Sequence, residues 1–301
     1  YTKTIFIETV RGCVHKCSYC SYHKQFRKLR PFDLGRITAE IEWALRSGVE
    51  EVSFIDPCFG RRPRLKPLLS ILEHAQDARP MKVSCELNAE DLTKDMADAL
   101  VRAGLKHAEV GLQSTNGKAL ALSGRRFDGA LFVRGVSMLR ERGVHVATDI
   151  MVGLPGDTLG DVKRSIDFVL ENGLCDSLNL FPVSVLPGTL LRAQAEEMGV
   201  SYQDLPPYYV TGTPWMGSEN IREAFAYAEG LTGESYFPVE LPRTGGVSLR
   251  TGKDRLISRL ILTRVTEGGR IPACSIGQAL AVEIDDPSWQ GRKEFMRRAL
   301  T

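Results

Sequence analysis

Hydrophobic and polar positions alternate with two periods from residue 4 to about residue 185. Short runs rich in β-branched and aromatic residues predict strands, and each is followed by a segment with apolar residues at i, i+3 and i+4 spacing, which predicts a helix. Glycines close several of the helical segments. The predicted strands are residues 4–8, 52–55, 82–87, 107–113, 144–152 and 177–183, and the predicted helices are residues 37–47, 67–78, 92–103, 129–142 and 159–172.

Six strand–helix repeats of this kind predict parallel strands joined by right-handed crossovers. Two closures satisfy the pattern, an open doubly wound sheet and a partial barrel. In both of them, ligands bind at the C-terminal ends of the strands. Beyond Pro187-Gly188 the rhythm changes. Residues 218–230 predict one more helix, with Ser218 as its N-cap and an inward face formed by Ile221, Phe225 and Ala228.

The pattern divides the chain into three parts. Residues 1–190 carry the strand–helix repeats, and residues 191–236 form a helical extension that we expect to pack on them. The Pro- and Gly-rich stretch 237–246 reads as a linker. It introduces a small C-terminal α+β tail over residues 237–301, with strands near 260–265 and 279–284 and a basic helix at the end.

Composition narrows the class of protein. The chain has 301 residues, 43% of them hydrophobic, which excludes a disordered tail. Its 39 Lys and Arg residues against 37 Asp and Glu residues leave a net charge of +2, so neither nucleic acid nor a membrane is expected as the main partner. No run approaches the roughly 18 apolar residues of a spanning helix. The first residue, Tyr1, is not Met, and we interpret it as the cut edge of a longer chain.

Seven cysteines are present, and three of them, Cys13, Cys17 and Cys20, crowd into one loop after the first predicted strand. This usage favours a reducing compartment, the cytoplasm, and a metal site over a disulfide scaffold. Three thiolates with three and then two intervening residues can wrap one face of a cubane cluster and leave its fourth iron open. The alternative is a three-Cys zinc site completed by His15 or His23.

The segment Cys13-Val14-His15-Lys16-Cys17-Ser18-Tyr19-Cys20 resembles the radical S-adenosylmethionine (SAM) superfamily, which carries Cys-x3-Cys-x2-Cys with an aromatic residue before the last Cys. The resemblance implies a partial (β/α)6 TIM-like barrel of α/β class. It also implies that the three cysteines bind a [4Fe–4S] cluster and that SAM chelates the open iron. One electron then cleaves SAM to methionine and a 5′-deoxyadenosyl radical, and the protein supplies orientation and exclusion of water.

Later motifs narrow the resemblance to the branch that contains cobalamin-domain radical SAM proteins, methylthiotransferases and oxygen-independent coproporphyrinogen dehydrogenases. They are Glu86 on the third strand, Gly111-Leu112-Gln113-Ser114 on the fourth, and Asp149-x-x-x-Gly153-Leu154-Pro155-Gly156 on the fifth, with Arg125 or Arg126 between the last two. The match covers about residues 4–230. The SAM contacts that it implies are Tyr19, Asp56, Glu86, Gln113, Ser114, Arg125, Asp149, Gly153 and Leu154.

The physical chemistry of these residue types agrees with those roles. Period-2 alternation places Glu109, Gly111 and Gln113 on one face of their strand, and the same alternation applies to Asp149 and Met151. Carboxylates at strand ends accept hydrogen bonds from ribose hydroxyls, and an arginine pairs with a carboxylate such as that of methionine. Taken alone, each residue is as well explained by an ordinary surface charge or ion pair.

One position departs from the pattern. Many radical SAM proteins carry a Gly-Gly-Glu-type turn after the second strand, where this chain has Asp56-Pro57-Cys58-Phe59. Either Asp56 or the neighbouring backbone carbonyls would then take the SAM ammonium group. Cys58 is a candidate catalytic residue, as a hydrogen-atom donor or substrate contact, but a small buried hydrophobic residue is the favoured interpretation.

Several functions fit this combination of motifs. The first is the catalytic part of a cobalamin-dependent methyltransferase, with cobalamin bound by a domain outside this chain, because these residues contain no Asp-x-His-x-x-Gly cobalamin motif. The second is a cobalamin-free radical SAM oxidoreductase, mutase or epimerase. A zinc-stabilised binding module is the alternative of another class, and near-neutral charge weighs against an RNA-modifying enzyme. The radical SAM hypothesis requires an electron donor such as flavodoxin or ferredoxin.

Overall fold

The computed structural model describes residues 3–25, 28–236, 257–262 and 279–284. The chain divides into two compact units, residues 1–237 and residues 238–301. The second unit contains two parallel strands, β11 (Ile257–Leu262) and β12 (Ala279–Ile284). The tail strand predicted near 260–265 therefore starts earlier, and the predicted basic C-terminal helix lies outside the described residues.

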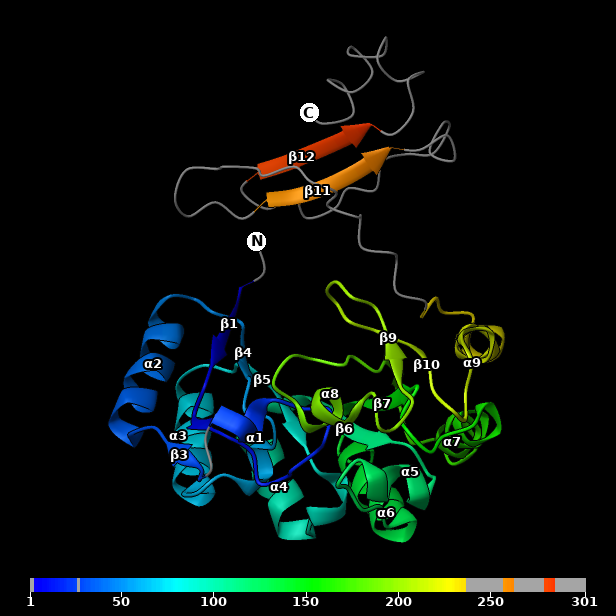
Figure 1. The fold of residues 1–301 in the computed structure, drawn as a ribbon. Helices are drawn as coiled ribbons and strands as arrows, with labels where there is room; N and C mark the ends of the chain where they lie inside the picture. The colour runs from blue at the N-terminus through cyan, green and yellow to red at the C-terminus, as the bar shows by residue number, and fades with distance from the viewer. Residues whose placement is uncertain (1–2, 26–27, 237–256, 263–278, 285–301) are drawn as a thin grey trace. The chain divides into compact units, whose positions relative to one another are not determined.

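A six-stranded parallel sheet forms the centre of the first unit (Figure 1). Each predicted strand is present, with ends that differ from the prediction by at most two residues. Within the sheet, side chains that face the helices are apolar and buried, as the alternating burial of β5 shows. The strands are β1 (Thr4–Ile7), β4 (Glu51–Phe54), β5 (Lys82–Leu87), β6 (Leu105–Gln113), β7 (His145–Val152) and β8 (Ser177–Pro182).

The strand order decides between the two closures that the sequence left open. Hydrogen-bonded neighbours run β1-β4-β5-β6-β7-β8, in chain order and without reversal. A doubly wound sheet reverses its order at a switch point. Right-handed crossovers without a reversal place every helix on the same side of the sheet. The partial (β/α)6 barrel is therefore confirmed, with β1 and β8 at the ends of the sheet.

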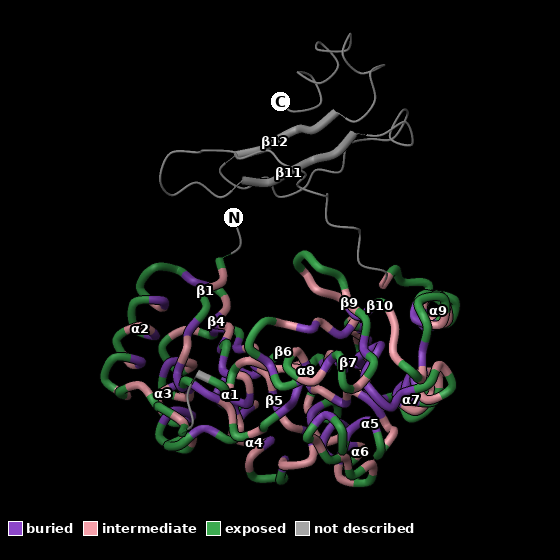
Figure 2. The backbone as a smooth tube through the Cα atoms, in the orientation of Figure 1, coloured by how far each residue is buried: buried purple, intermediate pink, exposed green. Residues whose placement is uncertain are grey.

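Five long helices form an arc around the strands (Figures 1 and 2). Their inward faces are buried and their outward faces are exposed, as expected for amphipathic helices. Side-chain caps at Asp33, Thr93, Asp128 and Thr158 fix where four of them begin. The helices are α2 (Leu34–Arg46), α3 (Leu65–Ala78), α4 (Lys94–Arg102), α6 (Gly129–Arg140) and α7 (Leu159–Glu171).

Glycine permits one close contact in this arc. A Cβ atom added at Gly135 of α6 would lie 1.9 Å from the carbonyl oxygen of Ala89, in the short 3-10 helix η2 (Ala89–Asp91). The predicted helix 92–103 is present as α4, and η2 precedes it as a short element that the sequence pattern did not predict. Gly135 thus lets α6 pack directly on the turn that follows β5.

Short elements that the sequence pattern did not predict surround the strand ends. Near the cysteines are β2 (Val10–Arg11), α1 (Tyr22–Gln25) and β3 (Arg30–Pro31), with η1 (Phe59–Arg61) after β4. They are two to four residues long, too short to show a hydrophobic period. The connection after β6 contains α5 (Gly117–Leu122), and the chain after β8 forms α8 (Leu190–Gln194), β9 (Ser201–Tyr202) and β10 (Val210–Gly212).

The extension ends in α9 (Ser218–Thr232), whose buried residues include the predicted Ile221, Phe225 and Ala228. The predicted cap was wrong: Gly217 occupies the N-cap position without a side-chain hydrogen bond, and Ser218 is the first helical residue. Ser218 therefore lies one residue beyond the N-cap position, where its hydroxyl does not cap the helix. Among the described residues, no helix is long and apolar enough to cross a membrane.

Candidate active site

The three cysteines lie on a loop that is closed at its base and clamped on two sides. At the base, β2 pairs with β3 in antiparallel fashion, with Arg11 opposite Arg30. In the middle, the Ser18 N–H donates to the Ser123 carbonyl at the end of α5 (3.0 Å), and the Leu191 N–H at the start of α8 donates to the Ser18 carbonyl (2.8 Å). A turn in which the Cys20 N–H donates to the Cys17 carbonyl (3.2 Å) closes the motif.

Asp56 anchors the start of this loop. Its fully buried carboxylate accepts hydrogen bonds from the Thr9 N–H (2.7 Å), the Thr9 hydroxyl and the Val10 N–H (3.1 Å). Its other neighbour is the equally buried Arg62, whose Nε lies 4.0 Å from Asp56 Oδ2. Because these groups occupy both oxygens, the structure gives Asp56 a supporting role, and of the two predicted partners for the SAM ammonium the backbone carbonyls remain.

The cysteine sulfurs lie close enough to one another to interact. Burial raises the pKa of the Cys13 and Cys20 thiols above the usual range, and the neighbouring sulfurs raise it further. Cys17 is buried and forms side-chain hydrogen bonds with the Tyr19 hydroxyl and the Arg125 guanidinium. Three neighbouring thiols are a donor set that a positively charged iron centre is expected to ionise.

The arrangement of donors separates the cluster from the zinc alternative. Within the described part of the chain, no three His, Cys, Asp or Glu side chains converge closely enough to hold a single metal ion. A zinc ion requires its four ligands around one point. In a cubane cluster each thiolate binds a different iron, so the sulfurs stand further apart. His15 belongs to no such convergent group in the described residues, although its buried Nε2 atom has no hydrogen-bond partner. The residues present fit the cluster.

Three carboxylates lie side by side at the centre of the sheet, downstream of the loop. Glu86 on β5 is paired in register with Glu109 on β6, and Asp149 on β7 is hydrogen-bonded to Glu109. Burial, and then Glu109, raises the pKa of Glu86 to about 7 and that of Asp149 to about 8. Asn179 on β8 donates to Asp149 Oδ1 at 3.0 Å. The predicted Glu86 and Asp149 are therefore brought together, with an unpredicted Glu109 between them.

The Gly-x-Gln motif has a specific backbone geometry at the end of β6. Gln113 has φ +69°, and the Ser114 N–H donates to the Leu112 carbonyl at 2.9 Å, which defines a strained γ-turn. The sheet register shifts at this point, so the simple alternation that we expected ends at Gly111. A Cβ at Gly111 would lie 2.3 Å from Gln113 Nε2. A side chain at this position would therefore displace the Gln113 amide, which folds back over Gly111.

Arg125 contacts both the end of β6 and the cysteine loop. Its Nη2 donates to the Gly111 carbonyl at 3.0 Å, and its guanidinium also contacts Cys17. The neighbouring Arg126 is exposed. Of the two predicted arginines, the structure therefore brings Arg125, and not Arg126, between the cysteine loop and the end of β6.

Hydrogen bonds connect the loop after β6, which contains Ser114, to the Gly-Leu-Pro-Gly turn after β7. The buried Ser114 hydroxyl donates to Asp157 Oδ1 at 3.1 Å, and Asn116 Nδ2 donates to the Gly156 carbonyl at 3.0 Å. Leu154 is fully buried, so its side chain belongs to the core and only its backbone is available to a ligand. Gly153 has φ +97°, a conformation that glycine adopts freely.

Cys58 is buried beside Cys13. The two residues line a cavity of about 10 Å³, which is close to the volume of one water probe and too small for a substrate. Burial raises the pKa of the Cys58 thiol to about 12, so the thiol stays protonated. This placement suits the interpretation of a small buried hydrophobic residue.

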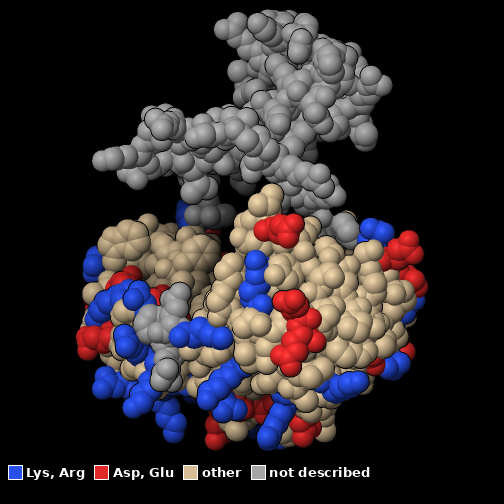
Figure 3. Space-filling model, in the orientation of Figure 1, with Lys and Arg blue, Asp and Glu red and all other residues tan. Residues whose placement is uncertain are grey.

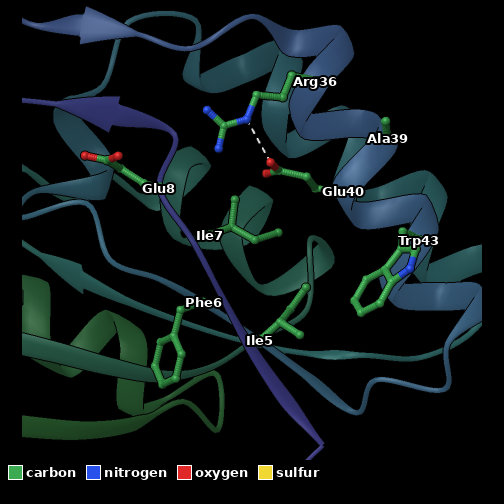
Figure 4. A pocket seen from close by; sticks show the side chains of 8 residues that line it. All are labelled: Ile5, Phe6, Ile7, Glu8, Arg36, Ala39, Glu40 and Trp43. Carbon is green, nitrogen blue, oxygen red and sulfur yellow. Dashed lines mark hydrogen bonds and ion pairs between the residues drawn. The ribbon is translucent and has the colours of Figure 1, made fainter. Parts of the chain in front are cut away.

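A larger hollow than this cavity lies elsewhere, on the β1 side of the sheet (Figure 4). It is a groove of about 460 Å³ between β1 and α2, and its α2 side carries an ion pair between Arg36 and Glu40 (2.7 Å). Apolar side chains of Ile5, Phe6 and Trp43 line it together with Glu8. Since none of the cysteines and none of the central carboxylates faces it, we place the candidate active site at the loop and not in this groove.

Sequence reasoning missed three supporting residues. Glu109 was available from its alternation with Gly111, and Asp157 follows the Gly-Leu-Pro-Gly motif directly. Arg62 gives no signal, because an arginine in an Arg-Arg-Pro-Arg stretch is ordinarily exposed and here it is buried against Asp56.

Comparison with known proteins defines the class. Residues 7–169, more than half of the chain, match the family model of the Radical SAM superfamily. The chain therefore belongs to the radical SAM superfamily and is an enzyme. Enzymes of this superfamily use a [4Fe–4S] cluster and SAM, so the prediction of these two cofactors is confirmed.

Two of the curated relatives are methyltransferases, and others are methylthiotransferases. The chain is 28% identical over 192 residues to the cobalamin-dependent radical SAM methyltransferase TokK of Streptomyces tokunonensis, covering 62% of this chain and 28% of that protein. It is 26% identical over 230 residues to the 2-(S-pantetheinyl)-carbapenam-3-carboxylate methyltransferase of Streptantibioticus cattleyicolor, covering 71% and 33%. The chain thus spans about a third of the length of these two relatives.

A solved structure supports the fold. The radical SAM methyltransferase TsrM of Kitasatospora setae, with cobalamin and a [4Fe–4S] cluster bound, superposes with a TM-score of 0.66 at 17% identity. The match covers 78% of this chain and 54% of that one. At this identity the likeness shows a shared fold, which agrees with the partial barrel derived from the strand order.

Proposed function

We propose that Cys13, Cys17 and Cys20 bind the [4Fe–4S] cluster and that the chain is the catalytic part of a cobalamin-dependent methyltransferase. The observation that carries the cluster site is the clamped loop, in which the three sulfurs interact and Cys17 contacts both Tyr19 and Arg125. When bound, the cluster supplies the electron that cleaves SAM to methionine and a 5′-deoxyadenosyl radical. The methyltransferase assignment is supported by the curated relatives.

The chain's own residues bind and orient SAM. Arg125, held by the Gly111 carbonyl next to Cys17, pairs with the methionine carboxylate beside the cluster. Glu86 lies on β5 and Asp149 on β7, the two strands that flank β6. Both carboxylates accept hydrogen bonds from the ribose hydroxyls. The Gln113 amide and the backbone at Gly153 and Leu154 contact the adenine. The buried Ser114–Asp157 tie fixes the two loops that carry these groups, so it acts on SAM through them.

The raised pKa of Asp149, about 8, keeps a proton at the centre of the three strands at neutral pH. Two carboxyl groups that share a hydrogen bond require one proton, as in the Glu109–Asp149 pair. A protonated pair limits the repulsion among the three carboxylates before SAM binds. When hydroxyl donors arrive, hydrogen bonds to the charged form favour ionisation of Asp149.

The test is anaerobic reconstitution of the 301-residue chain with iron and sulfide, followed by measurement of bound iron and of 5′-deoxyadenosine formed from SAM. Cys17→Ala is expected to abolish both, since it removes one of three ligands. Cys175→Ala is the matched control, because Cys175 precedes β8 at the opposite end of the strands, and it is expected to retain both. Cleavage of SAM by the Cys17→Ala variant would refute the cluster assignment.

A product measurement tests the methyltransferase part separately. With SAM, a reductant and added hydroxocobalamin, a cobalamin-dependent methyltransferase forms S-adenosylhomocysteine as well as 5′-deoxyadenosine. A cobalamin-free oxidoreductase, mutase or epimerase forms 5′-deoxyadenosine or regenerates SAM, without S-adenosylhomocysteine. Mass spectrometry that finds no S-adenosylhomocysteine under these conditions would contradict the proposal.

A further inference from the structure

The loop that carries the cysteines is far more basic than the rest of the chain. Between Glu8 and Asp33 the sequence has six Lys or Arg residues and no Asp or Glu, although the whole chain carries 39 basic against 37 acidic residues. A single short segment therefore accounts for a local charge of +6 in an almost neutral protein. The basic residues are Arg11, Lys16, Lys24, Arg27, Lys28 and Arg30.

The described members of this group lie at the surface around the cluster loop. Figure 3 shows Lys and Arg side chains gathered around α1 and β3. Lys16 and Lys24 both act on the imidazole of His23, whose pKa burial and then these two charges lower, so the two lysines face one surface. We call Arg11, Lys16, Lys24, Lys28 and Arg30, all of them exposed, the basic patch.

Most of this charge is not neutralised by the chain itself. Lys16, Lys24 and Lys28 form no ion pair with any residue that the structure describes, whereas Arg11 pairs with Glu8 (2.9 Å). Two apolar side chains lie within the patch: Val14, between Cys13 and Cys17, is 40% exposed, and Tyr22 is 52% exposed. An apolar centre with a cationic rim is the composition of a small protein–protein interface.

The reaction requires a partner at this place. Reductive cleavage of SAM consumes one electron per molecule, and none of the described side chains is a reductant that can supply it repeatedly. The donor must therefore approach the loop that holds the cluster. Transient electron-transfer complexes are small, and complementary charge accelerates their formation by about 10- to 1,000-fold.

We propose that the basic patch is the docking surface for an acidic electron-transfer protein with a flavin or iron–sulfur centre. This proposal rests on the cluster site proposed above. In the docked complex one electron passes from the donor to the oxidised cluster, so that the donor is oxidised by one electron and the cluster is reduced by one. A nucleic acid is the less suitable occupant, because the chain as a whole carries a net charge of only +2.

The test compares protein and small-molecule reductants. The charge-reversal variant K16E/K24E leaves the cysteines, Tyr19 and Arg125 unchanged. With reduced flavodoxin at low ionic strength, its rate of 5′-deoxyadenosine formation is expected to fall about tenfold or more below that of the unmodified chain. With dithionite and with reduced methyl viologen, two small reductants of opposite charge, the rate is expected to stay within about twofold.

The matched control is K82E/K106E, which makes the same change in net charge at exposed lysines near the opposite ends of the strands. It is expected to react normally with flavodoxin. Added salt should slow the flavodoxin-driven reaction of the unmodified chain and have little effect on K16E/K24E. Iron and sulfide analysis of each variant confirms equal cluster content, and the milder K16Q/K24Q variant serves if charge reversal lowers it.

Three outcomes would overturn the proposal. The first is an equal flavodoxin-driven rate in K16E/K24E and the unmodified chain. The second is an equal loss in K82E/K106E, which would show a general charge effect. The third is loss of binding to a labelled tRNA in K16E/K24E with the flavodoxin-driven rate intact, which would assign the patch to RNA. Failure of the unmodified chain to cleave SAM with dithionite would instead refute the cluster site itself.

Discussion

Acidic residues at the two ends of the central strands have opposite environments. Near the carboxyl ends of β5 and β7, the half-buried Glu86 and the buried Asp149 flank Glu109, and their pKa values are raised to about 7 and about 8. At the amino ends, Glu50 pairs with Lys3 (2.6 Å) and Asp176 with Arg140 (2.9 Å), and the pKa of each carboxyl is lowered. Carboxylates thus lack a cationic partner at the carboxyl ends of the strands and have one at the amino ends.

The difference indicates which end was shaped by ligand binding. Groups that stabilise a fold are paired and hydrogen-bonded in the free protein, as at the amino ends. Groups that await a ligand have unfavourable environments until it arrives, and perturbed pKa values cluster at functional sites for this reason. Among the described residues, none of the three central carboxylates forms an ion pair. The raised values agree with the site that we propose at the carboxyl ends.

Two glycines offer the largest test of this division. Gly111→Ala places a Cβ 2.3 Å from Gln113 Nε2, so Gln113 must leave its position at the site. We expect SAM affinity of the reconstituted protein to fall at least about tenfold, with the free energy of unfolding changed by less than about 1 kcal/mol. Calorimetric titration with SAM and urea unfolding measure the two quantities.

Gly135→Ala is the counterpart in the fold. Its Cβ would meet the rigid Ala89 carbonyl at 1.9 Å, and overpacking of this kind costs about 1–3 kcal/mol of stability. SAM affinity of the folded fraction should change less than in Gly111→Ala. If Gly135→Ala weakened SAM binding more than Gly111→Ala did, the division between site and scaffold would not hold.

The pH dependence of stability is the second test. The folded-state pKa of Asp149 is raised to about 8, so the folded protein holds a proton that the unfolded chain releases near pH 4. Its contribution to stability is therefore present at low pH and is lost as pH rises through 8, by up to about 1.4 kcal/mol per pH unit. Asp149→Asn should flatten this decline between pH 5 and 8 and weaken SAM binding, as measured by urea unfolding and titration.

An unchanged slope in Asp149→Asn would show that Asp149 is already ionised in the free protein. Glu109→Gln sharpens the measurement, because it removes the carboxyl group that shares the proton. We expect it to lower the pKa of Asp149, which carbonyl-stretch infrared difference spectra between pH 5 and 9 can follow. A change in the pKa of Asp149 would show that the two carboxyl groups share a proton. An unchanged pKa would show that Glu109 only packs beside Asp149.

The smallest effect is expected at the amino ends. Burial acts to raise the pKa of Asp176, but the Val146 N–H (2.9 Å) and Arg140 outweigh it, so the folded-state pKa is lowered. Asp176→Asn should cost about 1 kcal/mol at pH 7, and this cost should disappear in acid as pH falls through the folded-state pKa. SAM affinity should be unaffected. A cost that grows in acid would reverse the sign and contradict the pairing.

The fold was predictable to the extent that it depends on local periodicity. All six strands and the five long helices follow from apolar spacing, and α2 begins at Leu34, earlier than predicted, because the Asp33 side chain caps it. The choice of a barrel required the strand order, which depends on contacts between distant residues. The short elements around the cysteine loop are two to six residues long, below the length at which a hydrophobic period can be recognised.

The candidate site was predictable where a motif fixes chemistry and not where burial changes a role. The motifs placed Glu86, Gln113 and Asp149 on adjacent strands, and the structure brings them together. Asp56 was expected beside SAM, but it lies fully buried just after β4, where Thr9, Val10 and Arg62 surround its carboxylate. The γ-turn at Gln113 was not predictable, because glutamine has no preference for positive φ and tertiary contacts hold it there.

The most direct test of the central claim is Mössbauer spectroscopy of the reconstituted, iron-57-labelled chain with and without SAM. If Cys13, Cys17 and Cys20 hold three irons of a cubane, about four irons should be bound per chain. One of the four should change its isomer shift when SAM is added, and the other three should not. A spectrum that is identical with and without SAM, or a protein that takes up one zinc ion and no sulfide, would contradict the account.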